Sequence, residues 1–378
     1  MRCAKILFSL ILIVTVVFRC ACTVDALDIG AKSYVLLNAD TFEVIDSSDA
    51  HLRLPIASTT KLMTALILAE QEDLNTEIVT TAEMVTVEGS SMGLKVGDTV
   101  SYYELLVGML LPSGNDAANT TAIVLAGSLE KFADVMNLKA SELGMTNSHF
   151  VTPSGLDAKG HYSTAYDMAI LSAHVLKNKV IREIVSKEKI TLTFGNPPYE
   201  RTLYNHNKLL TRYEYCIGVK TGYTKKSGRC LVSAAQKDGC TVIAVTLNDS
   251  DDWNDHEKLL TYGLSLLESV NADENISLPN ISVVGGSCDN VSLLVPDFTC
   301  GVLQNSGSYL SHKLELPPFL YAPIDDGTSV GEISYYYNDV LIKKDPIKAA
   351  KGCIQSHTKQ RPFELFYNYF IGLLNCLI

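Results

Sequence analysis

Three short strings of residues, in a fixed order along the chain, constrain its fold more than any other feature. They are Ser58-Thr59-Thr60-Lys61, Ser113-Gly114-Asn115 and Lys220-Thr221-Gly222. Together they supply a serine nucleophile, a lysine that can take its proton, a second hydroxyl with an amide, and a cation for a carboxylate. Such a set suits acyl transfer without a histidine base. The strings predict a fold that brings three distant segments to one site.

Each string is weak on its own, because other segments fit the same patterns. Four such segments are Ser186–Lys189, Ser356–Lys359, Ser269–Asn271 and Lys226–Gly228. Only Ser58 precedes a helical pattern, in which Leu62, Leu66 and Ala69 share one face. Since residues three apart lie on one side of a helix, the Ser58 hydroxyl and the Lys61 amine can meet at its N-terminus. The alternative for Ser58 is a helix N-cap, but the other two strings favour a nucleophile.

The surroundings of the second and third strings also fit a catalytic site. Ser113 follows Pro112 in a loop that opens a helix, where a simple N-cap is the alternative. Lys220 lies in an apolar run that a glycine-containing turn separates from a second apolar run, which predicts a β-hairpin. The alternative for Lys220 is a strand lysine that extends to solvent. Beside Ser58, both strings favour the catalytic interpretation.

With these strings, the chain resembles the low-molecular-mass penicillin-binding proteins, the serine-type D-alanyl-D-alanine carboxypeptidases of peptidase family S11. Further blocks carry the resemblance over nearly the whole chain after the leader: 33–39, 110–118, 152–157, 161–167, 218–224, 259–263 and 322–333. The resemblance implies an α/β (α+β) serine β-lactamase/penicillin-binding-protein-like transpeptidase fold. It also implies a small C-terminal all-β domain.

The resemblance assigns a role to each string. It implies catalytic residues Ser58, Lys61, Ser113 and Asn115, and substrate-binding residues Lys220, Thr221, Gly222 and Tyr223. Lys61, its pKa lowered by burial and by Lys220, would deprotonate Ser58 for attack on a peptidoglycan stem peptide ending in D-Ala-D-Ala. The backbone N–H groups of Ser58 and Tyr223 would form the oxyanion hole. β-Lactam antibiotics mimic the same peptide end, and no metal or cofactor is implied.

The remaining roles concern the substrate. Ser113 would relay a proton to the departing D-alanine, Asn115 would hold a substrate amide, and Lys220 with Thr221 would bind the terminal carboxylate. Tyr223 stands where some relatives have histidine, which would alter substrate preference without removing the N–H donor. Two other classes stay open at this point: a class A β-lactamase and a catalytically silent wall-binding or scaffold protein. No E-x-x-L-N glutamate follows the second string, and the S-G-N string is of the carboxypeptidase kind.

The N-terminus predicts export. Arg2 and Lys5 precede an apolar run over 6–18, and Val24-Asp25-Ala26 offers a cleavage site, so 1–26 is interpreted as a signal peptide. The run is short for a membrane span. The alternatives are an uncleaved anchor and a lipoprotein leader through Cys20 or Cys22, which the neighbouring arginine disfavours.

The C-terminus predicts attachment to a membrane. From Phe363 to Ile378 the chain is apolar except for one narrow stripe at helical spacing, and Lys359 and Arg361 stand just upstream. We therefore interpret 359–378 as an amphipathic helix lying on the outer face of the cytoplasmic membrane. The alternative is a terminal helix packed on the protein's own core.

Composition and charge agree with this interpretation. The 378-residue chain has a formal net charge of -11, and 1–26 carries a net +2, so the remainder carries -13, which opposes nucleic-acid binding. Seven cysteines lie beyond the leader without a C-x-x-C pair, so no zinc site or dense disulfide scaffold is indicated. Cys288 with Cys300 is the first pair to test for a disulfide, and the sequence does not determine the pairing. Helical patterns end near Asn271, which predicts a carboxypeptidase domain over 27–267 and a β-rich domain over 271–352.

Overall fold

The computed structural model describes residues 27–273, 276–304 and 309–355, so the predicted signal peptide 1–26 and C-terminal helix 359–378 lie outside the described residues. Contacts divide the chain into two units. The first comprises 1–237 and 241–266, and the second comprises 238–240 and 267–378. Among the described residues, no helix has the length and apolar character needed to cross a membrane.

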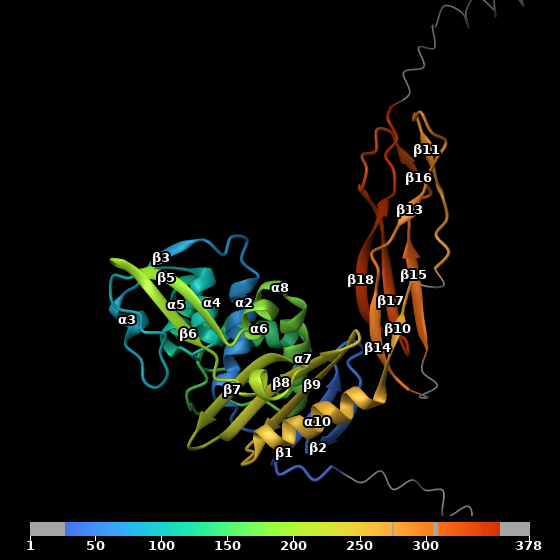
Figure 1. Ribbon diagram of the computed structural model, residues 1–378. Helices are drawn as coiled ribbons and strands as arrows, with labels where there is room; N and C mark the ends of the chain where they lie inside the picture. The colour runs from blue at the N-terminus through green and yellow to red at the C-terminus, as the bar shows by residue number, and fades with distance from the viewer. Residues whose placement is uncertain (1–26, 274–275, 305–308, 356–378) are drawn as a thin grey trace, which may run out of the picture. The chain divides into compact units, whose positions relative to one another are not determined.

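The first unit is built on a five-stranded sheet in the order β2-β1-β9-β8-β7 (Figure 1). These strands are β1 (Ser33–Asn38), β2 (Val44–Ser48), β7 (Cys216–Thr224), β8 (Gly228–Lys237) and β9 (Cys240–Leu247). All six residues of β1 are buried, because both faces of the sheet are covered. Val35 and Leu37 belong to the core formed with the helices, whereas Leu36 lies against Gly263 of α10 (Asp252–Leu266). The period of two thus assigns alternate β1 side chains to opposite faces.

Helices α4 to α8 of the first unit pack against α2. Besides α10, the helices of this unit are α2 (Lys61–Ala69), α3 (Ala82–Val85), α4 (Tyr102–Leu110), α5 (Asn115–Ala126), α6 (Leu129–Glu142), α7 (Ala165–Lys177), α8 (Lys179–Val185) and α9 (Leu209–Arg212). Two small hairpins complete the unit: β3 (Glu77–Val79) with β4 (Thr99–Ser101), and β5 (Lys189–Gly195) with β6 (Pro198–Tyr204). Every residue of α2 from Lys61 to Leu68 is buried, since α4, α5 and α7 pack around it. A helix enclosed in this way can hold a catalytic side chain rigidly.

The elements predicted around two of the strings are confirmed. Lys220 lies in β7, which pairs antiparallel with β8 across the predicted turn, and the second string opens α5. Around Ser58 the prediction of an α-helix is only partly right. Ser58 lies in a 3₁₀ turn, η1 (Ala57–Thr60), and α2 begins at Lys61. The Thr59 and Thr60 hydroxyls donate to backbone carbonyls three residues back, which favours this tight local turn.

The second unit contains only strands among its described residues. They are β10 (Leu267–Asn271), β11 (Ile281–Val284), β12 (Asn290–Val291), β13 (Leu293–Leu294), β14 (Thr299–Leu303), β15 (Leu310–Glu315), β16 (Phe319–Tyr321), β17 (Ser329–Tyr337) and β18 (Val340–Ala349). The largest sheet has the order β13-β18-β17-β15. Its core includes Ile333, Tyr335 and Ile347, all fully buried. Alternation of buried and exposed residues along β18 is typical of a sheet with one solvated face.

The disulfide joins Cys288 to Cys353, so the pair chosen for testing, Cys288 with Cys300, is not the bonded one. The sheet topology decides which of these residues meet. Cys300 is buried in β14, which pairs with β10. Cys288 follows β11, where Gly286 bridges Gln355 and so brings in the segment that carries Cys353.

Candidate active site

Lys61 is the centre of the site and joins the first two strings. Its Nζ lies 3.1 Å from Ser58 Oγ, 2.7 Å from Asn115 Oδ1 and 2.7 Å from the Ser154 carbonyl oxygen. The one-turn separation of Ser58 and Lys61 produces the first contact, as predicted. The Asn115 contact arises because α5 packs against α2. The lysine amine therefore has a fixed position beside the serine hydroxyl.

The surroundings of Lys61 favour its neutral form. The side chain is fully buried, and burial lowers its pKa well below the usual value, with the Lys220 charge adding to this effect and Asp116 opposing it. The predicted direction of the pKa shift, and both predicted causes, are confirmed. An unprotonated amine can accept a proton, so Lys61 is equipped to act as a base.

Ser113 presents a hydroxyl that the protein leaves unused. It is buried, its φ is 63°, and its Oγ has no hydrogen-bond partner within the described part of the chain. The N-cap alternative for Ser113 is wrong, because Gly114 occupies that position. A buried hydroxyl without a partner costs free energy, which is tolerated where it serves a reacting group.

The third string passes close to η1, the turn that carries Ser58, and the closest approach is at Gly222. A Cβ there would lie 3.0 Å from the Ile56 carbonyl oxygen and 3.1 Å from the Ser58 backbone nitrogen. A side chain here would push β7 and η1 apart by a few tenths of an ångström, so glycine favours the close approach of the segments that carry the Ser58 and Tyr223 N–H groups. Gly155 supports η1 from another direction, since a Cβ there would overlap the Ala57 carbonyl oxygen.

Lys220 is more enclosed than a lysine extending to solvent. It is 1% exposed, and its Nζ donates to the Thr221 carbonyl oxygen at 2.9 Å. Burial lowers the pKa of Lys220 to about 7. The alternative of a solvent-exposed strand lysine is therefore wrong. Tyr223, three residues on, is 66% exposed.

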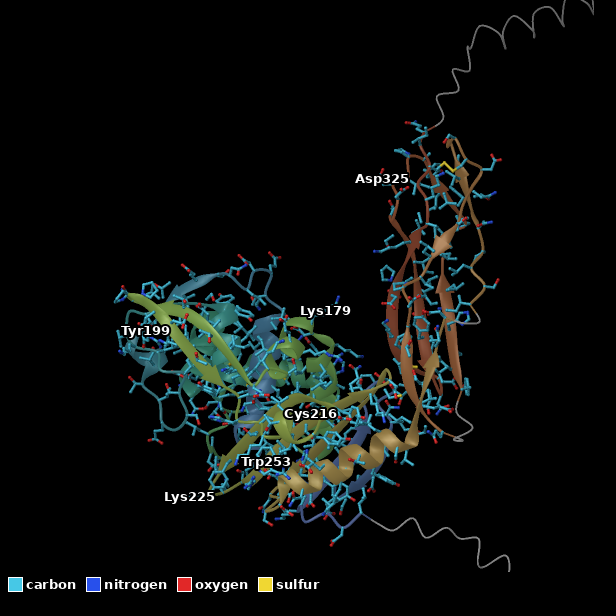
Figure 2. The ribbon with its side chains drawn as sticks, in the orientation of Figure 1. Lys179, Tyr199, Cys216, Lys225, Trp253 and Asp325 are labelled. Carbon is cyan, nitrogen blue, oxygen red and sulfur yellow. A yellow bond between two sulfur atoms is a disulfide. The ribbon has the colours of Figure 1, made fainter. Side chains whose placement is uncertain are left out.

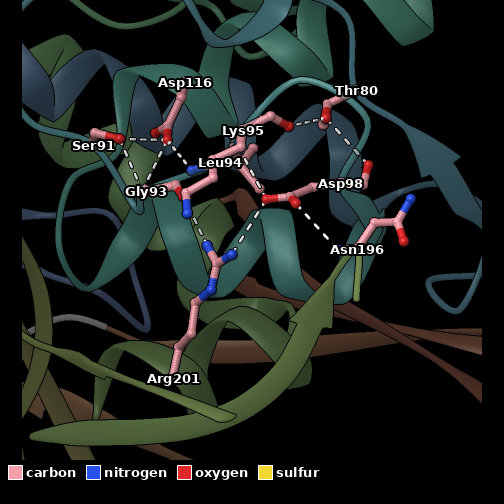
Figure 3. Close-up of polar contacts among 9 residues, drawn as sticks. All are labelled: Thr80, Ser91, Gly93, Leu94, Lys95, Asp98, Asp116, Asn196 and Arg201. Carbon is pink, nitrogen blue, oxygen red and sulfur yellow. Dashed lines mark hydrogen bonds and ion pairs between the residues drawn. The ribbon is translucent and has the colours of Figure 1, made fainter. Parts of the chain in front are cut away.

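A loop over 86–98 borders the site and is held by the Asp116 carboxylate (Figure 3). Asn115 donates two hydrogen bonds to carbonyl oxygens of this loop, one from its side-chain amide to Glu88 and one from its backbone N–H to Ser90. Asp116 accepts hydrogen bonds from the Ser91 hydroxyl and from three successive backbone N–H groups, at 2.5–3.0 Å. Asn115 of the second string thus binds Lys61, and Asp116, the next residue, anchors the wall of the site.

Arg201 ties the far end of the same loop to the β5–β6 hairpin. Its guanidinium donates to the Gly93 carbonyl oxygen at 2.8 Å and to Asp98 at 3.2 Å. Asp98 also accepts from the Lys95 and Asn196 N–H groups (Figure 3). The Arg201–Asp98 pair is nearly buried, so removal of one partner would leave an unpaired charge.

Replacement of Asp116 by asparagine should loosen this loop. The asparagine amide offers one oxygen where the carboxylate accepts several donors, and its NH₂ group would face N–H groups. We expect a loss of about 2–4 kcal/mol in the free energy of unfolding, measured by urea denaturation. The control is Asp134→Asn, on the exposed face of α6. Equal stability of the two variants would contradict the anchoring role.

A pocket of about 480 Å³ opens beside the nucleophile. Five of its lining residues are predicted site residues: Ser58, Ser113, Thr221, Gly222 and Tyr223. Six are not: Ser90, His206, Arg229, Cys230, Asp252 and Trp253. Burial and the Lys220 charge lower the pKa of His206, which leaves this ring neutral. All eight predicted site residues thus either line this pocket or, as Lys61, Asn115 and Lys220 do, are buried in contact with a string residue.

Comparison with known proteins identifies the family. The chain matches the D-alanyl-D-alanine carboxypeptidase family over residues 20–251. The chain belongs to that family. Residues 269–353 match the C-terminal domain of penicillin-binding protein 5. The predictions of a serine-type carboxypeptidase and of an all-β C-terminal domain are confirmed, and a class A β-lactamase is excluded.

Individual relatives are similar to this carboxypeptidase over most of its length. D-alanyl-D-alanine carboxypeptidase DacF of Bacillus subtilis is 31% identical over 336 residues, 84% of this chain and 85% of the relative. DacC of Escherichia coli is 32% identical over 86% of this chain and 84% of its own. Among solved structures, penicillin-binding protein 5 of Haemophilus influenzae superposes with a TM-score of 0.63 at 27% identity, covering 88% and 100% of the two chains. The Streptomyces K15 DD-transpeptidase gives 0.60 at 31% identity, over 63% and 98%.

Sequence reasoning missed several residues of the carboxypeptidase site. The Ser154 carbonyl oxygen that binds Lys61 lies in the block 152–157, which was noted for the resemblance but had no role. Its side chain gives no signal, because the backbone makes the contact. Asp116 follows the second string directly, and a buried acid at that place was detectable. Arg229 and Asp252 gave no signal, since only folding brings them together.

Proposed function

We propose that this carboxypeptidase removes the terminal D-alanine from peptidoglycan stem pentapeptides through an acyl-enzyme on Ser58. The observation that carries the proposal is the 3.1 Å contact between the buried Lys61 amine and the Ser58 hydroxyl. A neutral amine at this distance can take the hydroxyl proton as the serine attacks. The lowered pKa of Lys61 supports this role.

The attack forms a bond from Ser58 Oγ to the carbonyl carbon of the penultimate D-alanine. Negative charge develops on the carbonyl oxygen, and the backbone N–H groups of Ser58 and Tyr223 stabilise it, each by about 3–4 kcal/mol. The close approach of β7 and η1 at Gly222 supports this pairing of donors. Both donors are backbone groups, so the side chain at 223 is free to vary.

Collapse of the intermediate breaks the C–N bond and expels D-alanine. Its amine needs a proton, which passes from Lys61 through the Ser113 hydroxyl. The unpartnered, buried state of that hydroxyl supports the relay. Water then attacks the acyl-enzyme, gives a proton to Lys61, and releases the shortened peptide as Ser58 recovers its own proton.

The other string residues bind substrate. Asn115 holds a substrate amide, while Thr221 and Lys220 receive the terminal carboxylate. A β-lactam presents a carbonyl and a carboxylate in a similar arrangement, so it acylates Ser58 and inhibits the enzyme. The activity places the protein in cell-wall maturation, outside the cytoplasm. A signal peptide over 1–26 would export the protein, and an amphipathic helix over 359–378 would attach it to the outer face of the cytoplasmic membrane.

The test measures D-alanine release from diacetyl-Lys-D-Ala-D-Ala beside labelling by a fluorescent penicillin, on the same purified protein. Release together with a long-lived label on Ser58 is the expected result. Rapid penicillin turnover without D-alanine release would contradict the proposal. A folded protein that gives neither signal would support the silent wall-binding alternative.

A further inference from the structure

His161 is a buried titratable residue that none of the roles above uses. It is 6% exposed and does not line the pocket beside Ser58, so its ring has no direct access to a substrate there. Two segments that surround Lys61 nevertheless meet at this ring. One is η1, which carries the nucleophile, and the other is a loop over 151–155, which carries a backbone oxygen that binds the lysine amine.

The hydrogen bonds of the ring determine which of its nitrogen atoms carries the proton. Nε2 lies 2.8 Å from the Thr60 hydroxyl oxygen, and that hydroxyl already donates its proton to the Ala57 carbonyl oxygen. The ring must therefore donate from Nε2–H. Nδ1 accepts hydrogen bonds from the backbone N–H groups of Val151 and Thr152, at 3.0 and 3.3 Å. A neutral ring satisfies both sides, whereas a second N–H at Nδ1 would face two N–H donors.

The surroundings of the ring keep it neutral and fixed. Burial lowers the pKa of His161 to about 4, with the charge of His149 adding to the effect and that of Asp157 opposing it. The Phe150 ring packs against the imidazole in a T-shaped arrangement, with centroids 5.9 Å apart. At neutral pH the ring is therefore a bridge with one donor and one acceptor.

The loop on one side of this bridge supplies backbone oxygens to the helix that carries the base. The Ser154 carbonyl oxygen accepts from Lys61 Nζ at 2.7 Å, and the Pro153 carbonyl oxygen accepts from the Thr64 hydroxyl of α2 at 2.7 Å. None of the loop's residues belongs to a helix or a strand. Its position therefore depends on contacts such as those of His161, which bond its first two N–H groups.

We propose that His161 is a positioning residue, whose ring holds the Ser154 carbonyl oxygen in place so that the Lys61 amine stays fixed beside the nucleophile. The amine must take a proton and later return it, and a rigid acceptor keeps it in the same geometry for both steps. The proposal rests on the proposed function, because it assumes that Lys61 acts as the base. The competing explanation is that the ring only stabilises the fold.

The kinetic test uses three substitutions. His161→Leu removes both nitrogen atoms, whereas His161→Asn keeps an acceptor near the Nδ1 position and His161→Gln keeps a donor near the Nε2 position. For D-alanine release from diacetyl-Lys-D-Ala-D-Ala, kcat of the leucine variant should fall at least about tenfold, while KM stays within about twofold because the pocket lining is intact. The asparagine and glutamine variants, which each keep one contact, should recover part of the loss.

His256 provides a matched control. It is also a fully buried histidine, whose ring nitrogens bond to the Ser233 and Thr246 hydroxyls, and burial lowers its pKa to about 3. It lies near the start of α10, close to Trp253 in the sequence (Figure 2). His256→Gln should therefore lower the free energy of unfolding, measured by urea denaturation, without lowering kcat.

The kinetic outcomes distinguish a positioning role from a structural one. An equal fall in kcat in His161→Leu and His256→Gln would show a structural role and overturn the proposal. Asparagine and glutamine variants no more active than the leucine variant would also overturn it, because the nitrogen atoms would then not matter. If the leucine variant does not fold, these two variants carry the comparison, and full activity in both would overturn the proposal.

A measurement without turnover separates this proposal from the proposed function. In Ser58→Ala protein, NMR titration of the lysine side chains follows the pKa of Lys61. The Ser154 carbonyl oxygen favours the charged amine, so its displacement by His161→Leu should lower the Lys61 pKa further, whereas His256→Gln should not change it. This shift would support the role of His161 even if the wild type released no D-alanine, a result that would contradict the proposed function alone. An unchanged or raised Lys61 pKa would overturn the role of His161 even in an active enzyme.

Discussion

Replacement of Ser58 by alanine should abolish both D-alanine release and penicillin labelling. The alanine has no oxygen to form the acyl bond, so we expect kcat to fall by about 10⁴-fold or more. The fold should persist, because the hydroxyl that is removed bonds to Lys61 and Ser58 is not a member of the hydrophobic core. Product analysis by chromatography and mass measurement of the penicillin adduct provide the two readouts.

Another Ser-x-x-Lys segment of the chain, Ser186–Lys189, provides a matched control for this substitution. Ser186 is the C-cap residue of α8, and its hydroxyl donates to the Glu183 carbonyl oxygen of the same helix. Ser186→Ala should therefore keep full activity and labelling. Labelling that survives in Ser58→Ala but disappears in Ser186→Ala would reverse the assignment of the nucleophile.

Replacement of Lys61 should lower the acylation rate almost as much, and arginine at this position should not restore it. Lys61→Arg keeps a positive charge that cannot be lost at usable pH, whereas Lys61→Met keeps the length without a base. If Lys61 takes the Ser58 proton, both variants should lose about 10³–10⁴-fold in acylation rate by penicillin. Substantial activity in the arginine variant alone would show that charge, and not proton transfer, is what the site requires.

The pH dependence of acylation gives a second view of Lys61. A base must be unprotonated, so the rate should rise with pH as Lys61 loses its proton and then level off. Since burial and Lys220 lower the Lys61 pKa, this rise should end well below the ordinary lysine value of 10.5. A rate that still climbs steeply between pH 9 and 10 would indicate an exposed, ordinary lysine instead.

The sequence predicted most of this site because its parts depend on local spacing. Ser58 and Lys61 are one helical turn apart, and Lys220 lies in a hairpin whose turn is visible as glycine between apolar runs. The order of the three strings along the chain also distinguished them from the other segments that fit the same patterns. Contacts of this kind need little knowledge of the tertiary structure.

Contacts made by tertiary packing could not be predicted in the same way. The partner of Arg229 stands 23 residues further along the chain, at the start of another element. Likewise, Cys288 bonds to a cysteine 65 residues away instead of to the nearer Cys300. Neither pairing follows from periodicity or composition, because each depends on how strands and helices are ordered in space.

The two buried lysines link proton release to the folding of the enzyme. In an unfolded chain both amines would titrate near 10.5, whereas in the folded protein the pKa of Lys220 is about 7 and that of Lys61 is also lowered. Between about pH 7 and 10.5 the unfolded chain therefore binds more protons, so the free energy of unfolding rises with pH across that window. Acidification restores charge to amines that the interior cannot solvate. The neutral amine needed for chemistry at Ser58 is thus also the form that favours the folded enzyme.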